Sequence, residues 1–245
     1  MIKAILIDDE ELACDLLEEY LQAFRQIEVV ARCHDGFAAV KAVQEQQPDL
    51  LFLDVQMPKL SGFEVLQLLD NPPAVIFTTA FDQYAVQAFE NQAVDYLLKP
   101  FSQERFAQAV QRYLDLSPAE KEKTQERQAA LAAPAMGAQR LVLRRGAQVH
   151  LLPFARILYL QADGDYVHLF TQEGKFTQKK ALQHYESLLP RDVFVRLHRS
   201  YLVNIAHIEK VEPYGKNTHL ARIKSGEQIP VSRSGYQRLK GYWES

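Results

Sequence analysis

Through its first 115 residues the chain alternates short apolar runs with stretches of helical spacing, and this alternation constrains the fold more than any other feature. Because βαβ alternation builds a parallel sheet with helices on both faces, we predict an α/β unit with five strands. The runs are almost unbroken in Ile, Val, Leu and Phe, as strands buried on both faces require. The expected strands are residues 4–7, 29–33, 50–53, 75–78 and 94–98, and the expected helices are residues 12–24, 36–46, 62–69, 83–91 and 102–114.

The first helical stretch has a marked apolar stripe. Residues four apart lie on the same face of a helix, so a stripe of this spacing is expected to face the sheet. Its members recur at intervals of four, with two further leucines beside them: Leu12, Leu16, Tyr20 and Phe24, then Leu17 and Leu21.

After Arg140 the apolar period changes to two, which predicts a mainly antiparallel β unit. A helix is expected at residues 181–188 and another from about Ser234. We divide the chain into domains 1–116 and 139–245, joined by a charged, Gln- and Ala-rich linker at 117–138 that is either partly helical or an extension of the preceding helix. The expected strands are residues 140–144, 148–152, 157–161, 166–171, 174–178, 195–196, 201–204, 208–213, 219–223 and 228–230.

The charge distribution differs sharply between the two halves. Residues 1–115 carry 8 Lys and Arg against 19 Asp and Glu, whereas residues 139–245 carry 17 against 9, although the whole chain has a net charge of only −3. A basic half suggests a nucleic-acid partner.

Several features favour a cytoplasmic location. The longest apolar runs are too short to span a bilayer, so we expect no membrane association. The acidic N-terminal region argues against a secretory signal. Cys14 and Cys33 show no metal-ligand spacing and fit a reducing compartment as buried thiols.

Acidic residues follow two of the predicted strands. Asp8 and Asp9 come directly after residues 4–7, and Asp54 comes directly after residues 50–53. Functional residues of a doubly wound sheet gather at the carboxyl ends of its strands, so neighbouring first and third strands would bring the three carboxylates together. Carboxylates that close repel one another, and a hard divalent cation such as Mg²⁺ resolves the conflict.

Two more strand ends carry residues that suit a phosphoryl group. Thr79 follows residues 75–78 and Lys99 follows residues 94–98. An ammonium and a hydroxyl would stabilise the oxygens of a phosphoryl group while Asp54 acts as the nucleophile. A single Asp at a strand end is usually only a helix cap, but five such groups on four strand ends favour a phosphoryl site.

Residues 1–115 resemble the flavodoxin-like receiver domains of response regulators. The resemblance rests on five short segments, namely Leu6–Glu10, Phe52–Pro58, Ser61-Gly62, Thr79-Ala80 and Tyr96–Pro100. It implies that Asp54 accepts a phosphoryl group from a sensor histidine kinase.

The resemblance also implies roles for the neighbouring residues. Asp9, Asp54 and the backbone carbonyl of Gln56 would bind Mg²⁺ directly, with Asp8 acting through water. Thr79 and Tyr96 would form a switch pair, although Tyr96 is otherwise explained as a core aromatic. Lys99-Pro100 is expected to be cis. Residues 83–91 and 102–114 would form a dimer surface that depends on phosphorylation.

The basic half lacks the helix pair of a helix-turn-helix. Its segments 157–167, 196–204 and 231–233 resemble the LytTR DNA-binding domain. This family implies a small ten-stranded β fold whose loops enter successive major grooves, commonly at paired repeats, and a protein that acts as a homodimer. Arg199 and Arg233 are the implied base-reading residues.

Further DNA contacts are expected near these arginines and in the loop 165–168. The acidic residues Asp163 and Asp165 argue against phosphate binding by that loop, and His198 is either a DNA contact or a structural hydrogen-bonding residue. The additional candidates are Asp165, Tyr166, His168, His198, Ser200, Lys216 and Arg238.

The leading hypothesis is a phosphorylation-controlled transcription regulator rather than an enzyme. One alternative is a Mg²⁺-dependent phosphohydrolase, but the sequence shows no capping insertion that could form a substrate pocket. Another is a regulator whose β domain binds protein or RNA.

Overall fold

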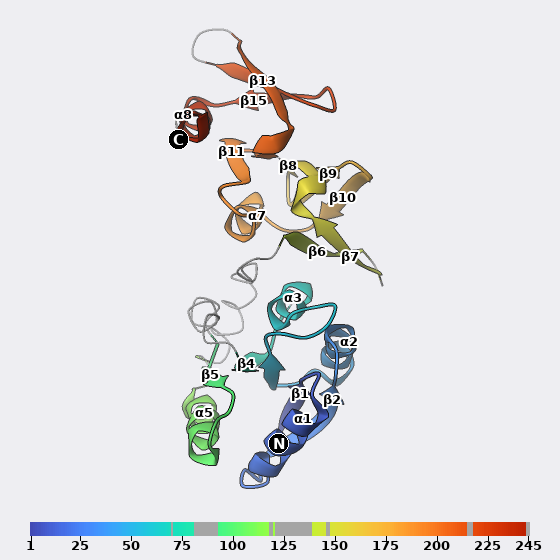
Figure 1. The fold of residues 1–245 in the computed structure, drawn as a ribbon, viewed down its shortest axis with the longest axis vertical. Helices are drawn as coiled ribbons and strands as arrows, with labels where there is room; N and C mark the ends of the chain where they lie inside the picture. The colour runs from blue at the N-terminus through green and yellow to red at the C-terminus, as the bar shows by residue number, and fades with distance from the viewer. Residues whose placement is uncertain are drawn as a thin grey trace. The chain divides into compact units, whose positions relative to one another are not determined.

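The computed structural model describes residues 1–69, 71–80, 93–117, 120, 139–145, 148–214 and 218–243. The chain forms two compact units, Met1–Gly137 and Ala138–Ser245, which are described separately below. Figure 1 shows their secondary structure. The linker predicted at 117–138 lies outside the described residues except for Ser117 and Glu120. No helix of the described residues is long and apolar enough to cross a membrane.

The first unit contains the predicted parallel sheet, with the strand order β2-β1-β3-β4-β5. Its strands are β1 (Ile2–Ile7), β2 (Ile27–Cys33), β3 (Leu50–Asp54), β4 (Ala74–Thr79) and β5 (Asp95–Leu98). β1 and β3 are neighbours, as predicted, and Ile7 pairs with Leu53. Asp54 and Thr79 are the last residues of their strands rather than the first residues after them.

Helices cover both faces of this sheet (Figure 1). On one face α1 (Glu11–Leu21) and α5 (Gln103–Asp115) share a core with alternate residues of the strands, among them Leu6 and Phe52. α2 (Gly36–Gln46) packs against α3 (Gly62–Leu68) as well as against the first two strands. The helix predicted at 83–91 lies outside the described residues.

The apolar stripe predicted for the first helix is confirmed at Leu17 and Leu21, and Tyr20 and Phe24 pack against the same core, but its first two leucines face away from it. The residues of α1 that are buried are Cys14, Leu17 and Leu21, whereas Leu12 is 81% exposed and Leu16 is 38% exposed. Two residues span about 200° of helix rotation, so Leu12 and Leu16 lie almost opposite Cys14. A short, small side chain at position 14 suits the close approach of α1 to the sheet, and that preference is not visible in a pattern of large apolar residues.

The second unit has a five-stranded antiparallel sheet in the order β10-β9-β8-β12-β11. A three-stranded sheet, β13-β14-β15, and the hairpin β6-β7 complete ten strands among the described residues. The bounds are β6 (Arg140–Arg145), β7 (Gln148–Pro153), β8 (Ile157–Asp163), β9 (Tyr166–Thr171), β10 (Gly174–Gln178), β11 (Phe194–His198), β12 (Tyr201–Asn204), β13 (Ile208–Pro213), β14 (His219–Ile223) and β15 (Gln228–Val231). The helices are α7 (Leu182–Leu188) and α8 (Arg233–Trp243), with 3₁₀ turns η2 (Phe154–Arg156) and η3 (Ile205–His207).

Two hydrophobic clusters use alternate residues of the central strands. One joins Leu160 and Leu202 to Tyr185 of α7 and to the hairpin β6-β7. The other joins Leu197 to the three-stranded sheet and to Leu239 of α8. Because side chains alternate across a strand, the central sheet is covered on both faces, by α7 and β6-β7 on one and by the small sheet and α8 on the other.

Candidate functional sites

The acidic residues at the ends of β1 and β3 form a cluster. One carboxylate oxygen from each of Asp8, Asp9 and Asp54 lies within 4.8 Å of the others. Asp8 is fully buried and Asp54 is 7% exposed, whereas Asp9 is exposed. The adjacency of β1 and β3 in the sheet explains this arrangement, since parallel strands end at the same edge.

Lys99 brings a positive charge into this acidic cluster. Its Nζ donates to Asp8 Oδ2 at 2.6 Å and to Asp54 Oδ2 at 3.2 Å. Backbone groups hold the other carboxylate oxygens, because Glu10 N donates to Asp8 Oδ1 and Gln56 N donates to Asp54 Oδ1, each at 3.1 Å. The peptide bond Lys99-Pro100 is cis, as expected.

Burial controls the protonation of the acidic cluster. It raises the pKa of Asp54 to about 6, against the opposing effect of Lys99. Burial also raises the pKa of Asp8. For Lys99 the hydrogen bond to Asp8 and the charge of Asp54 outweigh burial, so its pKa is raised and it remains an ammonium. Three carboxylates therefore face one fixed cation.

The other predicted residues of the first unit lie at or near the same sheet edge. Thr79 is buried at the end of β4, and its carbonyl accepts from Lys99 N at 2.7 Å. Asp54 pairs with Thr78, which places Thr79 one residue beyond Asp54 along the edge. Tyr96 is on β5, the last strand in the sheet order, where it pairs with Phe77 of β4, and it is half-buried.

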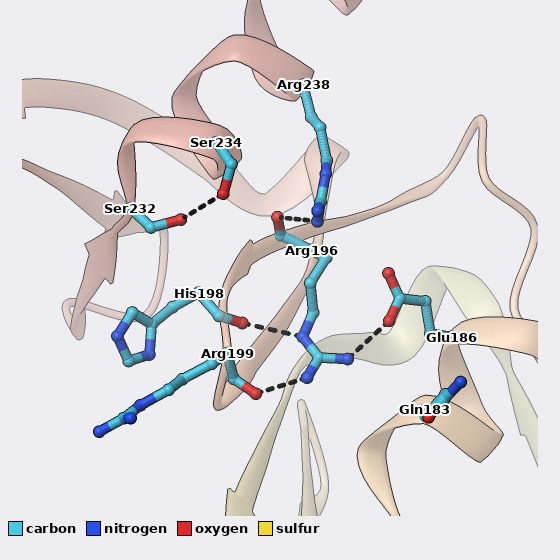
Figure 2. Close-up of a pocket in the computed structure, with 8 residues that line it drawn as sticks. All are labelled: Gln183, Glu186, Arg196, His198, Arg199, Ser232, Ser234 and Arg238. Atoms are coloured by element: carbon cyan, nitrogen blue, oxygen red, sulfur yellow. Dashed lines mark hydrogen bonds and ion pairs between the residues drawn. The ribbon is translucent and has the colours of Figure 1, made fainter.

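The second unit has a basic surface pocket of about 470 Å³ (Figure 2). It lies where α7, the β11-β12 hairpin and the start of α8 meet. Three arginines give it a positive character, opposed by one carboxylate. The residues that line it are Gln183, Glu186, Arg196, His198, Arg199, Ser232, Ser234 and Arg238.

Close packing fixes the start of α8 against β11. Ser232 Oγ donates to the carbonyl of Leu197 at 3.0 Å and accepts from Gly235 N at 3.0 Å. A Cβ at Gly235 would lie 2.0 Å from the carbonyl oxygen of Leu197, so the helix can approach this closely only with glycine there. This contact sets Ser232, Arg233 and Ser234 beside the hairpin.

The structure brings some predicted DNA contacts together and separates others. His198, Arg199 and Arg238 line the pocket, and Arg233 is exposed at the first residue of α8. Ser200 N donates to His198 Nδ1 at 3.3 Å, which supports a structural use of that histidine. Burial, with the charges of Arg199 and Arg196, lowers the pKa of His198.

The loop between β8 and β9 does not contribute to this pocket. Asp165 and Tyr166 are exposed there. Both ring nitrogens of His168 have partners, Thr177 Oγ1 at 3.0 Å and Asp163 Oδ2 at 3.4 Å. Lys216 lies outside the described residues.

Sequence reasoning missed two residues that shape the pocket. Arg196 was noticed only as part of a basic segment, and Glu186 was not noticed at all. An acidic residue in a helix has no signal that marks it as the partner of a particular arginine, because α7 and β11 meet only through tertiary packing.

Comparison with known proteins identifies both units. A family model for the response regulator receiver domain matches residues 4–111, and one for the LytTr DNA-binding domain matches residues 147–244. The "Sensory transduction protein LytT" of Bacillus anthracis is 34% identical over 98% of this chain and 98% of its own length. The chain belongs to the LytTR response regulators.

Other relatives of this response regulator span equally complete chains. The "Transcriptional regulatory protein BtsR" of Escherichia coli K12 is 35% identical, and an "Uncharacterized response regulatory protein" of Vibrio cholerae is 36% identical. Each match covers 98% of both chains. The receiver and LytTR domains make this chain a two-component, DNA-binding transcription regulator.

Proposed function

We propose that Asp54 accepts a phosphoryl group from a sensor histidine kinase and thereby controls sequence-specific DNA binding by residues 139–245. The placement of Asp54 carries the proposal. Its carboxylate lies in a cluster of three, within hydrogen-bonding distance of Lys99, at the open edge of a parallel sheet. A structural aspartate gains nothing from two further carboxylates beside it.

The chemistry follows from these neighbours. A carboxylate oxygen of Asp54 uses a lone pair to form an O–P bond with the phosphoryl group of a phosphohistidine. The P–N bond breaks, and its electron pair returns to the imidazole, which leaves. Lys99 Nζ stays beside Asp54 and stabilises the negative oxygens of the phosphoryl group.

The acidic cluster also fits Mg²⁺. Three carboxylates against one ammonium leave an excess of negative charge, and their oxygens are the ligands that Mg²⁺ prefers. Asp9, Asp54 and the Gln56 carbonyl would hold the ion. As the family resemblance implies, Asp8 would act on the ion through water. When bound, Mg²⁺ neutralises charge that develops on the phosphoryl oxygens.

Phosphorylation would then be transmitted through Thr79 and Tyr96. A phosphoryl group adds roughly −1.5 to −2 charge and three strong acceptors, which would draw the Thr79 hydroxyl toward it and leave room for Tyr96 to rotate. Such a change would alter the surface of β5 and α5 and favour a homodimer on paired DNA repeats.

Replacing the acceptor tests the first half of the proposal. We expect an Asp54→Ala protein to incorporate no phosphate from acetyl phosphate with Mg²⁺, because the substitution removes the proposed nucleophile, which lies at the end of β3 and accepts a hydrogen bond from Lys99. Intact-mass spectrometry measures the incorporation. Asp115→Ala, at the exposed end of α5, is the control and should be labelled as the wild type is. Labelling of Asp54→Ala would refute the assignment, and rapid turnover of a small phosphate ester by the wild type would favour a phosphohydrolase instead.

Arg199 and Arg233 are the proposed base-reading residues. Both are exposed, and within the described part of the chain neither guanidinium has a hydrogen bond or ion pair. Arginine binds guanine through two parallel hydrogen bonds and therefore needs an uncommitted guanidinium. The exposed loop residues Asp165 and Tyr166 would form a second contact.

Alanine replacements test this second half. We expect Arg199→Ala and Arg233→Ala each to cost about 1–3 kcal/mol at a site selected from random DNA, with little change on non-specific DNA. Fluorescence anisotropy at stated salt measures both affinities. Lys224→Ala, in the exposed β14-β15 turn, controls for the loss of one positive charge. Equal losses on random DNA would assign the arginines to phosphates, and an absence of DNA binding would favour a protein or RNA partner.

Both steps would take place in the cytoplasm. Cys14 and Cys33 are free and buried, and burial raises the pKa of each thiol to about 11. Such thiols are protonated and unreactive, which fits a reducing compartment.

A further inference from the structure

Arg196 lies at the centre of the basic pocket but directs its guanidinium into the protein. Its side chain is 17% exposed. Nε donates to the carbonyl of His198 at 2.8 Å, Nη2 donates to the carbonyl of Arg199, and Nη1 donates to Glu186 Oε2 at 2.6 Å (Figure 2). All three nitrogens of this guanidinium are therefore used within the domain.

These contacts hold the turn of the β11-β12 hairpin. The carbonyls of His198 and Arg199 lie at consecutive positions of the turn, and the guanidinium of Arg196 donates a hydrogen bond to each of them. Because the guanidinium is planar and rigid, these two bonds restrict the conformation of the turn. Glu186 fixes the guanidinium from the opposite side. That residue is on α7, which is anchored in the core by Leu182 and Tyr185.

The neighbouring arginines have different environments. Figure 2 shows the side chain of Arg199 extending away from that of Arg196. Arg199 is exposed and lacks a side-chain partner among the described residues, whereas Arg238 Nη1 donates to the carbonyl of Arg196 at 3.1 Å. The pocket thus contains Arg196, whose guanidinium is fully hydrogen-bonded within the domain, and, three residues later, Arg199, whose guanidinium has no partner among the described residues.

We propose that Glu186 and Arg196 are a positioning pair that holds the hairpin turn so that Arg199 faces DNA, while neither member of the pair contacts DNA itself. This inference rests on the proposed role of Arg199 in base recognition. The proposal also explains why an acidic residue, Glu186, lies on a DNA-binding surface, where its charge by itself would repel DNA.

Charge and positioning predict opposite effects when Glu186 is removed. A carboxylate beside the polyanionic backbone repels it, so its loss by a purely electrostatic effect would strengthen binding to all DNA. Loss of a positioning contact instead lets the turn move, and misplaced base contacts weaken binding only at the specific site. The sign of the change at the specific site therefore separates the two.

The test compares affinities for a selected site and for random DNA, using the full chain. We expect Glu186→Ala to weaken specific binding about tenfold while non-specific binding stays the same or becomes stronger. Glu186→Gln retains an acceptor oxygen and should restore much of the specific affinity. Asp192→Asn removes an exposed negative charge of the same domain that does not line the pocket, so this variant should retain discrimination between the two DNAs.

A double-mutant cycle with Arg199→Ala shows whether the pair acts through that residue. If it does, Glu186→Ala should have little further effect once Arg199 is absent. Arg196→Met should lower specific affinity and leave the salt dependence of non-specific binding unchanged. A salt slope reduced by about one would mean that Arg196 contacts a phosphate, and it would overturn the proposal.

The outcomes also separate this inference from the proposed function. If the wild type shows no site preference, or if Arg199→Ala retains full affinity, the proposed role of Arg199 in DNA recognition fails. If Arg199→Ala loses affinity and Glu186→Ala behaves as Asp192→Asn does, only the positioning pair is refuted. Thermal unfolding of each variant checks folding, and Arg196→Met, which removes the other member of the pair, provides the same comparison of DNAs if Glu186→Ala does not fold.

Discussion

At the scale of single residues, the acidic cluster shows how a functional site works against stability. Asp54 and Asp8 are buried beside a third carboxylate, and Lys99 compensates only part of their charge. Desolvation therefore raises the pKa of Asp54 to about 6. The same uncompensated negative charge would make Asp54 bind a cation strongly and attack a phosphoryl group.

This shift predicts how stability depends on pH without metal. The folded-state pKa of Asp54 is above its unfolded value of 3.8, so the folded protein binds an extra proton between the two values. The resulting stability is complete below pH 3.8 and is lost as the pH rises through about 6. From pH 5 to pH 7.5 we expect the unfolding free energy of the receiver domain to fall by about 1 kcal/mol from this residue, which is several degrees in Tm.

Calorimetry of the full chain in EDTA measures the effect, with Asp54→Asn as the comparison. The variant should lose this part of the pH dependence, while Asp8, whose pKa is also raised, retains its own contribution. Lys99 does not interfere, because its raised pKa affects stability only above its ordinary value of 10.5. Identical pH profiles for the two proteins would contradict the expectation.

Asn204 shows that a residue within a recognised motif can be wholly structural. It belongs to the segment that resembles the LytTR family, yet it is 1% exposed. Its amide donates to the carbonyls of Phe154 and Ile157, and its Oδ1 accepts from Ala206 N. Asn204 therefore joins η2, β8 and η3 rather than contacting DNA.

At the scale of elements, the close contact between α8 and β11 determines the shape of the basic pocket. We expect Gly235→Ala to destabilise the domain by about 1–3 kcal/mol, since the new Cβ would lie 2.0 Å from the Leu197 carbonyl oxygen. Specific DNA affinity should fall as well, because the helix start carries Arg233. Chemical denaturation followed by circular dichroism measures the stability.

The same helix offers a matched control. Gly241 also lies in α8, but no atom of the described residues is within 4 Å of a Cβ built there. Gly241→Ala should therefore be neutral or stabilising by up to about 1 kcal/mol, as expected for alanine in a helix. If both variants were equally stable, the close approach of α8 to Leu197 would not be the reason for glycine at position 235.

Element types could largely be predicted from the sequence, whereas the buried face of a helix could be predicted only in part. The ten strands of the second unit and four of the five helices of the first were predicted within a few residues, because periodicity reports which element forms. In the stripe on α1, Leu17 and Leu21 are buried as predicted but Leu12 and Leu16 are exposed, because Leu12 and Cys14 both satisfy a helical period and only packing against α5 and the sheet chose between them.

At the scale of the whole molecule, the chain combines an acidic receiver unit with a basic DNA-binding unit. We expect phosphorylation to increase affinity for the selected DNA site, because a phosphorylation-driven dimer would hold two DNA-binding domains on paired repeats at a high effective concentration. Mobility shifts with and without acetyl phosphate and Mg²⁺ measure the change, and sedimentation measures the oligomer. Asp54→Ala should show neither effect, and an equal response in that variant would mean that the donor acts elsewhere.

The sequence by itself determined the two fold classes, the strand-end carboxylates with Lys99, and the basic segment around Arg199, because each depends on local periodicity or on residues close together in the chain. Only the tertiary structure decided which residues of the apolar stripe on α1 are buried, that Gly235 must be small, and that the Arg196 guanidinium pairs with Glu186 while that of Arg199 has no partner among the described residues. These features depend on contacts between elements that are far apart in the sequence. Which residues meet there is set by the spacing and orientation of the packed elements and not by residue type alone.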